Sequence, residues 1–233
     1  AGSVAEHTLM LMLACARRTV QYDARVRDLN WGVVPELPTH DIAGRTVLIL
    51  GFGRIGTRVA RLCAAFGLNV LVYDPFIPVG TIRGSGYEAV VDLRDGLAVA
   101  DIVTLHCPSS AETRGLVNAD FLGAMKRGAF FINAARGKLV EEAALAEALR
   151  SGQVAMAGID VLYDEPVSAT NPLLDAPNCI FSPHTAASSH EGTRRMALSA
   201  AQSVLDCFHD RLPADVIVNP EALQRRPALA VAG

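Results

Sequence analysis

The stretch TVLILGFGRIGTRVARLCAAFGLNVLVYD, residues 46–74, decides the fold. It begins with a short run of β-branched and aliphatic residues and continues through a glycine-rich turn. Apolar residues then recur at helical spacing from Ile55 to Phe66, and Gly67 ends that pattern. A second apolar run, residues 69–74, follows. A strand, a helix and a second strand in close succession predict a parallel βαβ unit.

The turn has the spacing of a dinucleotide-binding loop. Gly51, Gly53 and Gly56 form G-x-G-x-x-G between the predicted strand and helix. The first glycine permits the tight turn, the second lets the backbone approach a pyrophosphate, and the third allows close packing of helix on strand. The helix N-terminus attracts the anion.

Asp74 indicates NAD rather than NADP. It lies at the end of the second predicted strand, where a carboxylate accepts hydrogen bonds from the adenosine ribose hydroxyls. The same carboxylate would repel a 2′-phosphate, and no arginine follows it directly in DPFIP, residues 74–78. The sequence therefore predicts NAD as the cofactor.

The rest of the chain repeats the alternation of strand and helix. Further strand-like runs span residues 101–106, 129–133, 155–161 and 179–182, and helical patterns lie after Asp92 and over residues 119–125 and 141–150. Strands that are apolar throughout and separated by helices predict an α/β fold, a Rossmann-type doubly wound parallel sheet covered on both faces. The Pro- and Gly-rich residues 30–44 read as a connector.

Composition narrows the class of protein. The chain has 233 residues, of which 51% are hydrophobic and 19% charged, so a substantial core is expected. With a net charge of −3, the chain has no excess of positive charge for binding nucleic acid. The five cysteines are scattered without a CxxC pair, which favours a reducing cytoplasm over a disulfide scaffold or a metal site.

The amino-terminal stretch SVAEHTLMLMLACARR, residues 3–18, reads as a buried helix. A secretory signal has a positively charged leader, whereas the only certain side-chain charge here is that of Glu6. The apolar run is also too short to span a membrane. Ser3 and Glu6 have the S-x-x-E spacing of a capping box, which predicts the start of the helix.

Three polar features follow predicted strands. Arg136 lies in a small-residue loop, and its planar guanidinium suits a carboxylate. Asp160, Asp164 and Glu165 follow the next strand, and His184 follows the last one. Taken singly, each feature is also typical of an ordinary surface loop. A histidine paired with a carboxylate, however, is a proton donor near neutral pH.

Together these motifs resemble the D-isomer-specific 2-hydroxyacid dehydrogenase family. The resemblance rests on SVAEHTLMLML, GRTVLILGFGRIGTRVA, YDPF, ADIVTLHCPSSAETRGLVN, MKRGAFFINAARGKLVEEAAL, GIDVLYDEP and SPHTAASS. It implies an NAD-dependent oxidoreductase that transfers a hydride between nicotinamide and a small 2-hydroxy or 2-oxo acid. Plausible substrates include 3-phosphoglycerate, hydroxypyruvate and glyoxylate.

The resemblance also implies roles for individual residues. Arg136 would hold the substrate carboxylate and carbonyl, and His184 would be the acid/base with Glu165 as its partner. The implied cofactor-binding residues are Gly51, Gly53, Arg54, Ile55, Gly56, Asp74, Cys107, Pro108, Thr113, Ala134, Asp160 and His184, with Asp160 at the carboxamide end. His7, His40, His106, His190 and His209 are expected to be structural or surface residues.

The resemblance implies three parts of the chain. Residues 1–31 would be an interdomain helix that contributes to a homodimer interface, and residues 32–187 the NAD-binding domain. Residues 188–233 would form a helix, capped by Ser188 with Glu191, and a C-terminal segment ending in a loose tail. These are remnants of a substrate domain whose earlier part precedes the first helix in the family, so a truncated chain is expected.

Three alternatives remain open on sequence. A dinucleotide-sensing corepressor of the same fold keeps Arg136, Glu165 and His184. A formate dehydrogenase is disfavoured, since relatives of that type carry glutamine where Glu165 stands. A fragment that binds NAD and catalyses nothing is the third.

Overall fold

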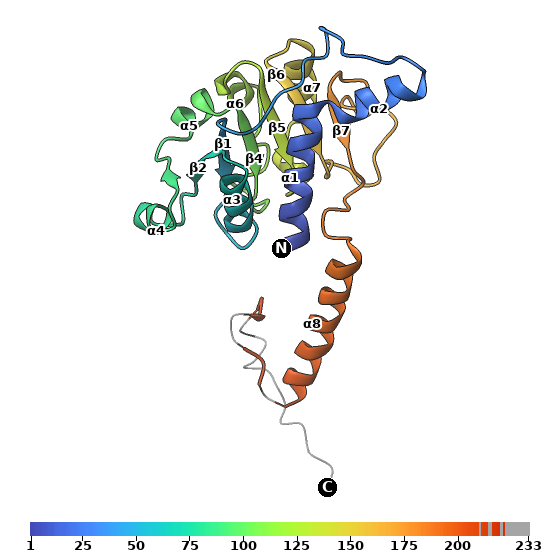
Figure 1. Cartoon of the computed structure of the whole chain (residues 1–233). Coiled ribbons are helices and arrows are strands. Elements are labelled where there is room, and N and C mark those ends of the chain that lie inside the picture. The colour runs from blue at the N-terminus through green and yellow to red at the C-terminus, as the bar shows by residue number, and fades with distance from the viewer. Residues whose placement is uncertain (210, 214–215, 220, 222–233) are drawn as a thin grey trace. The chain divides into compact units, whose positions relative to one another are not determined.

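The computed structural model describes residues 1–209, 211–213, 216–219 and 221 (Figure 1). The chain falls into two compact units, one ending at Ser188 and the other beginning at Ser189. The predicted C-terminal tail, residues 223–233, lies outside the described residues.

The described part of the first unit contains a seven-stranded sheet of order β3-β2-β1-β4-β5-β6-β7, in which all neighbours are parallel. The strands are β1 Thr46–Leu50, β2 Asn69–Tyr73, β3 Glu88–Ala89, β4 Ile102–Leu105, β5 Ala129–Asn133, β6 Val154–Ile159 and β7 Cys179–Phe181. The prediction of a doubly wound parallel sheet is confirmed. Only β3 had no counterpart among the predicted strands, because two residues carry no readable pattern.

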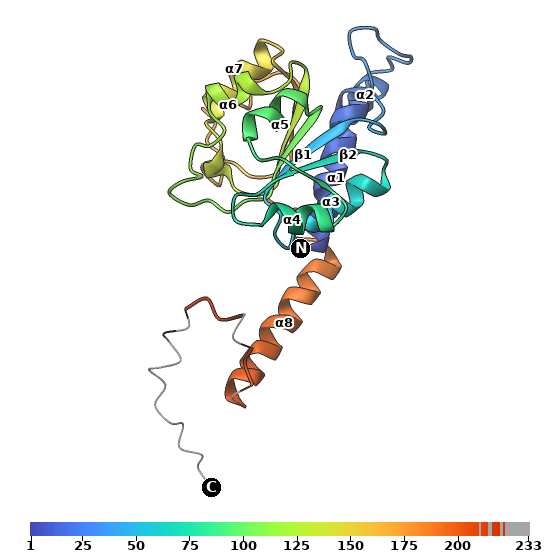
Figure 2. The same cartoon turned by 90° about the vertical axis from the view of Figure 1, so that its left-hand side faces the viewer.

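Helices cover both faces of the sheet (Figure 2). One face packs with α1 Gly2–Arg17, α3 Gly56–Ala65 and α4 Val79–Gly84, and the other with α5 Leu93–Val99, α6 Ala119–Ala124 and α7 Glu142–Arg150. Successive strand residues point to opposite faces. Val47 and Ile49 therefore join the α1 and α3 side, whereas Leu48 and Leu50 join the α5 to α7 side.

Helix α1 is buried as predicted, but it begins earlier than predicted. Its N-cap is Ala1, with no side-chain cap, and the Ala5 amide donates to the Ala1 carbonyl at 3.1 Å. Ser3 therefore lies inside the first turn, and the capping box predicted from Ser3 and Glu6 is wrong. The helix packs against α3, β5 and β6 through residues such as Leu11 and Met12.

Arg18 ends α1 and changes the direction of the chain. Its backbone is left-handed, with φ 50°, and α2 Thr19–Arg27 follows at once. Its guanidinium donates to the Pro38 carbonyl at 3.1 Å and to Asn178 Oδ1 at 3.0 Å. Residues 1–31, predicted as one interdomain helix, therefore hold two helices. Residues 30–44 contain no helix or strand, as predicted for a connector.

The described part of the second unit contains α8, His190–Phe208. Its N-cap is Ser189, whose hydroxyl accepts a hydrogen bond from the Gly192 amide at 2.9 Å. The predicted cap, Ser188 with Glu191, is thus one residue early, because the extended backbone that precedes the helix includes Ser189. Among the described helices, none combines the length and the apolar character needed to cross a bilayer.

Candidate active site

The glycine loop lies where the strand order reverses, between β1 and β4. Open α/β sheets bind ligands at this point, outside the carboxyl ends of the strands. Gly51 follows β1 with φ 98°, and a Cβ there would lie 2.7 Å from the His106 carbonyl carbon. A Cβ on Gly56 would overlap the Gly51 carbonyl oxygen, whereas one on Gly53 would meet nothing within 4 Å. Two glycines are thus required by the protein's own packing, and Gly53 faces open space.

Asp74 is fixed beside this loop. Its carboxylate accepts hydrogen bonds from the Phe52 amide at 2.8 Å and from the Phe76 amide at 2.9 Å. It lines a cleft of about 350 Å³ together with Gly51, Gly53, Cys107, Pro108 and Thr113. The glycine loop, where a Cβ would fill the space open to a ligand, fits the pyrophosphate of NAD. The Asp74 carboxylate, which is fixed beside that loop, fits the adenosine.

This cleft continues toward the predicted catalytic residues. A second cavity, of about 470 Å³, shares His106, Cys107 and Pro108 with the cleft and adds Ile55, Ala134, Arg136, Asp160 and His184. A third, of about 330 Å³, shares Arg136 and His184 with the second and adds Lys138, Tyr163 and Glu165. The shared residues make one groove along the carboxyl ends of the strands. Of the predicted residues, Arg54 and Asp164 are exposed and line none of these three cavities.

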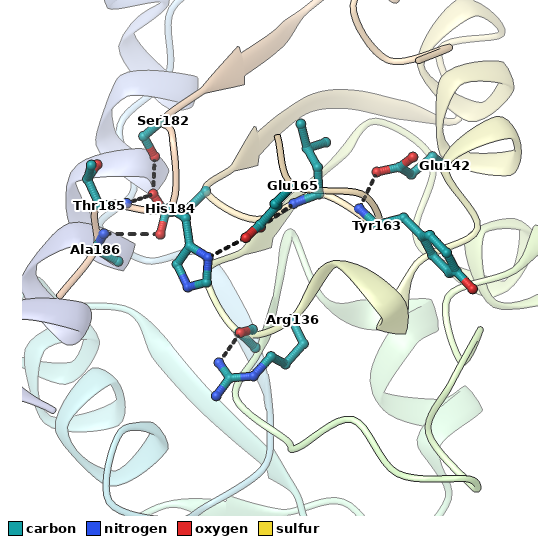
Figure 3. Close-up of polar contacts among 11 residues, drawn as sticks. Arg136, Glu142, Tyr163, Glu165, Ser182, His184, Thr185 and Ala186 are labelled. Atoms are coloured by element: carbon teal, nitrogen blue, oxygen red, sulfur yellow. Dashed lines mark hydrogen bonds and ion pairs between the residues drawn. The ribbon is translucent and has the colours of Figure 1, made fainter. Parts of the chain in front are cut away.

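His184 and Glu165 form a close pair. The distance from His184 Nδ1 to Glu165 Oε2 is 2.6 Å (Figure 3). The other carboxylate oxygen of Glu165 accepts a hydrogen bond from the Leu162 amide at 3.0 Å. The side chains of His184 and Glu165 are 51% and 39% exposed, so the pair is open to a ligand in the groove. With Nδ1 held by the carboxylate, Nε2 is the ring nitrogen left for proton exchange.

Asp160 holds the loop that carries His184. Asp160 is 2% exposed, and its carboxylate accepts hydrogen bonds from Ser182 Oγ at 2.6 Å, the Thr185 amide at 2.9 Å and the Ala186 amide at 3.1 Å (Figure 3). Its carbonyl accepts from the His184 amide at 2.8 Å. His184 itself has φ 53°, a left-handed conformation that these bonds support. The predicted contact of Asp160 with the cofactor carboxamide stays a prediction.

Asn133 shapes the loop of Arg136. The Asn133 amide donates to the Arg136 carbonyl at 3.0 Å, and its oxygen accepts from the Ala135 amide at 3.0 Å. A Cβ on Gly137 would overlap the Leu162 carbonyl oxygen, so the short helix η1, Gly137–Leu139, packs tightly against the segment after β6. The Arg136 side chain, which donates to the Ala135 carbonyl, consequently lies below the His184 ring in Figure 3.

His106 lies where the cofactor cleft meets the second cavity. Burial lowers the pKa of its imidazole to about 3, and its Nε2 lies 3.0 Å from Thr104 Oγ1. The ring is therefore neutral at physiological pH. Burial also raises the pKa of the adjacent Cys107 thiol, which disfavours a nucleophilic thiolate there.

Several residues of the site were not singled out by sequence. Asn133, Ser182 and His7 all support the loops of Arg136 and His184, although His7 was expected to be only structural or at the surface. The only feature of the sequence that could have identified Asn133 and Ser182 is their position directly at the ends of strands. Among the described residues, no group of three or more His, Cys, Asp or Glu side chains is placed to hold a metal ion.

Comparison with known proteins identifies the family of this chain. Residues 9–186 match the model of the D-isomer specific 2-hydroxyacid dehydrogenase NAD binding domain. The chain is 39% identical over 204 residues to D-3-phosphoglycerate dehydrogenase of Archaeoglobus fulgidus, covering 88% of this chain and 38% of that protein. It is 37% identical over 228 residues to glyoxylate reductase of Korarchaeum cryptofilum, covering 97% and 68% respectively.

A solved structure has a similar fold. D-lactate dehydrogenase of Aquifex aeolicus, complexed with NAD and lactic acid, superimposes with a TM-score of 0.81 at 31% identity, covering 90% of this chain and 67% of that one. The chain thus spans 38% to 68% of the length of these three relatives. It belongs to the D-isomer specific 2-hydroxyacid dehydrogenase family, of which it contains the NAD-binding domain.

Proposed function

We propose that this protein is an NAD-dependent oxidoreductase that transfers a hydride between nicotinamide and a small 2-hydroxy or 2-oxo acid. The observation that carries the proposal is the 2.6 Å contact between His184 and Glu165, in a cavity that also contains Arg136 and opens into the NAD cleft. An acid/base, its carboxylate partner and a fixed cation are the groups that reduction of a 2-oxo acid requires.

Gly51, Gly53, Gly56 and Asp74 would hold the pyrophosphate and adenosine ribose of NAD. When bound, NADH supplies the hydride that reduces the keto carbon. Protonated His184 donates the proton from Nε2 to the keto oxygen. Glu165 accepts the Nδ1–H hydrogen bond, fixes the ring orientation and stabilises the charged imidazole until the proton is transferred.

Arg136 would bind the substrate. A guanidinium can hold a carboxylate through two parallel hydrogen bonds while a further N–H faces the neighbouring carbonyl oxygen. That geometry fixes the distance between the keto carbon and the cofactor, and it stabilises negative charge that develops on the oxygen. In the 2-hydroxy acid direction the same groups work in reverse, with neutral His184 accepting the hydroxyl proton.

The names of the relatives suggest the substrate class. They are dehydrogenases of 3-phosphoglycerate and glycerate and a reductase of glyoxylate, so 3-phosphoglycerate, hydroxypyruvate and glyoxylate are the first candidates. We also propose a homodimer formed through residues 1–31, where Val20, Leu29 and Trp31 are 54%, 92% and 88% exposed. The reducing cytoplasm is the proposed compartment, because the five cysteines form no disulfide in the described part of the chain.

The test is a pair of measurements on the purified chain. NADH titration followed by fluorescence measures binding, and NADH oxidation with a panel of 2-oxo acids measures turnover. We expect both, with turnover lowered about 10²- to 10⁴-fold in His184→Asn, a variant that tolerates the left-handed backbone at this position. If the chain binds NADH but turns over none of the 2-oxo acids in the panel, the proposal is overturned for this chain. The chain would then be a cofactor-binding unit without catalysis.

A further inference from the structure

His7 connects α1 to the loop that carries the acid/base. Its side chain is 17% exposed, and its Nε2 lies 2.8 Å from Ser182 Oγ and 3.3 Å from Asp160 Oδ1. We propose that His7 is a positioning residue, which holds His184 in its productive orientation through Ser182 and Asp160. The inference rests on the proposed function, in which His184 is the acid/base.

The hydrogen bonds have a definite direction. A serine hydroxyl has one hydrogen, and Ser182 Oγ lies 2.6 Å from Asp160 Oδ1, a carboxylate oxygen that only accepts. Ser182 therefore donates to Asp160 and has lone pairs left for His7. The Nε2 of His7 must then carry the hydrogen and donate to Ser182. The chain of donors runs from His7 to Ser182 to Asp160.

The Asp160 carboxylate passes this constraint on to His184. Its Oδ1 also accepts a hydrogen bond from the Thr185 amide, and its Oδ2 accepts one from the Ala186 amide. Thr185 and Ala186 are the two residues that follow His184. Rotation of the carboxylate would lengthen these bonds. The left-handed backbone of His184 would then lose two of the contacts that support it, and the alignment of Nδ1 with Glu165 would be weakened.

His7 is suited to fix that rotation. Among the described residues, it provides the only Lys, Arg or His nitrogen within 4.0 Å of the Asp160 carboxylate. The helix that carries His7 is itself held in place, because α1 is packed against β5, β6 and α3 through Leu11, Met12 and Cys15. A contact between positions 175 residues apart thus ties the loop after β7 to a buried helix.

The decisive variants are His7→Gln and His7→Leu. Glutamine can place an amide N–H close to the position of Nε2, whereas leucine has similar bulk and no donor. We expect His7→Leu to lower kcat for a 2-oxo acid about tenfold, the equivalent of one hydrogen bond of about 1.4 kcal/mol, with KM for NADH and the Tm nearly unchanged. His7→Gln should recover most of the lost kcat.

A readout independent of turnover is the nitrogen NMR spectrum of the imidazole rings. The His184 signals are assigned by their loss in His184→Asn. We expect them to shift in His7→Leu and to return toward the wild-type position in His7→Gln. If the wild-type chain proves inactive, the proposed function fails, but this spectrum still tests whether His7 controls the His184–Glu165 pair.

Ser182→Ala supplies the third variant. Because His7 and Ser182 are links of one chain, the double variant His7→Leu, Ser182→Ala should be no worse than either single variant. The proposal is overturned by unchanged His184 signals in His7→Leu, by additive losses in the double variant, or by His7→Gln being as impaired as His7→Leu. The last result would mean that the shape of the ring, and not its hydrogen bond, is what the site requires.

Discussion

The two ends of the groove are shaped by different parts of the chain, one by the backbone and the other by side chains. At the cofactor end, the shape comes from backbone: Gly51 and Gly56 lie where a Cβ would collide with neighbouring main-chain atoms. At the acid/base end, the shape comes from side chains, with Asn133 and Asp160 bonded to the loops that carry Arg136 and His184.

This difference predicts how each end responds to substitution. A change at the cofactor end alters the packing of strand and helix, so binding and stability should fall together. A change at the acid/base end alters half-exposed side chains, and His184 and Glu165 are 51% and 39% exposed. Chemistry there should change while the fold and the cofactor affinity persist.

The largest effect is expected from His184→Asn. Loss of a general acid/base lowers rates by about 10²- to 10⁴-fold, and kcat should fall within that range. The affinity for NADH should change only a few-fold, because the glycine loop is untouched. Steady-state kinetics and fluorescence titration measure the two quantities. An equal loss of affinity and rate would show that the two ends are not separable in this way.

Next in size are the effects of two glycine substitutions that separate packing from binding. Gly56→Ala brings a Cβ onto the Gly51 carbonyl, so it should lower the free energy of unfolding by about 1–3 kcal/mol and weaken NADH binding as well. Gly53→Ala meets no protein atom within 4 Å and should leave the free energy of unfolding within about 0.5 kcal/mol.

Gly53→Ala should still weaken NADH binding about tenfold or more, because the pyrophosphate would approach the backbone at this residue. Denaturant unfolding and NADH titration of both variants provide the comparison. Unchanged affinity in Gly53→Ala would mean that the cofactor does not approach this residue.

Arg136→Lys should raise the KM for a 2-oxo acid about 10- to 100-fold, since lysine keeps the charge but loses the planar fork, and hydrogen bonds to charged groups contribute about 1.5–3 kcal/mol. NADH affinity should be unaffected. Lys138→Gln is the matched control, because Lys138 lines the same cavity without such a fork. An unchanged KM in Arg136→Lys would mean that Arg136 contributes only positive charge, and an equal rise in Lys138→Gln would mean that the effect is not specific to the guanidinium fork.

The smallest effect concerns His106, which lies between the two ends. Its pKa falls from 6.5 to about 3 on folding, so below pH 6.5 the unfolded chain binds a proton that the folded chain does not. Stability from this group is therefore complete above pH 6.5 and decreases toward pH 3, by at most about 1.4 kcal/mol per pH unit.

We expect the wild type to lose about 1–2 kcal/mol more than His106→Gln between pH 7 and pH 5, as measured by urea unfolding at both values. Because glutamine does not titrate, the difference between the two proteins isolates this residue from the other histidines. Equal losses would mean that His106 is protonated in the folded protein.

The parts of the fold that the sequence predicted are those with a local signature. The six longer strands are continuous apolar runs, and the glycine loop lies within one βαβ unit, so neighbouring residues are sufficient to identify them. Strand β3 and helix α4 were missed because both are short, and α2, which buries no residue, was predicted only as the continuation of one helix over residues 1–31. Cap positions were displaced by one or two residues, because Ser189 caps α8 in place of its neighbour Ser188 and because α1 begins at Gly2 without any side-chain cap.

The candidate site was predictable where a residue stands at the end of a strand, as Arg136, Asp160 and His184 do. The supporting contacts were not predictable in the same way. His7 lies in the middle of an apolar helix, and its partner Ser182 is 175 residues away. No periodicity or spacing in the sequence reports a contact of that kind, which exists only once the sheet has brought β6 and β7 beside α1.

The packing of α1 also has a consequence during synthesis. Ribosomes deliver α1 before the strands against which it packs, β5 and β6. Leu9, Leu11 and Met12 therefore have no sheet to cover them while β1 to β4 assemble, and exposed apolar surface of that kind favours aggregation. Helix α1 is thus made before the whole sheet but is covered by β5 and β6 only after they emerge, which makes the nascent chain a natural client for chaperones that shield a hydrophobic helix.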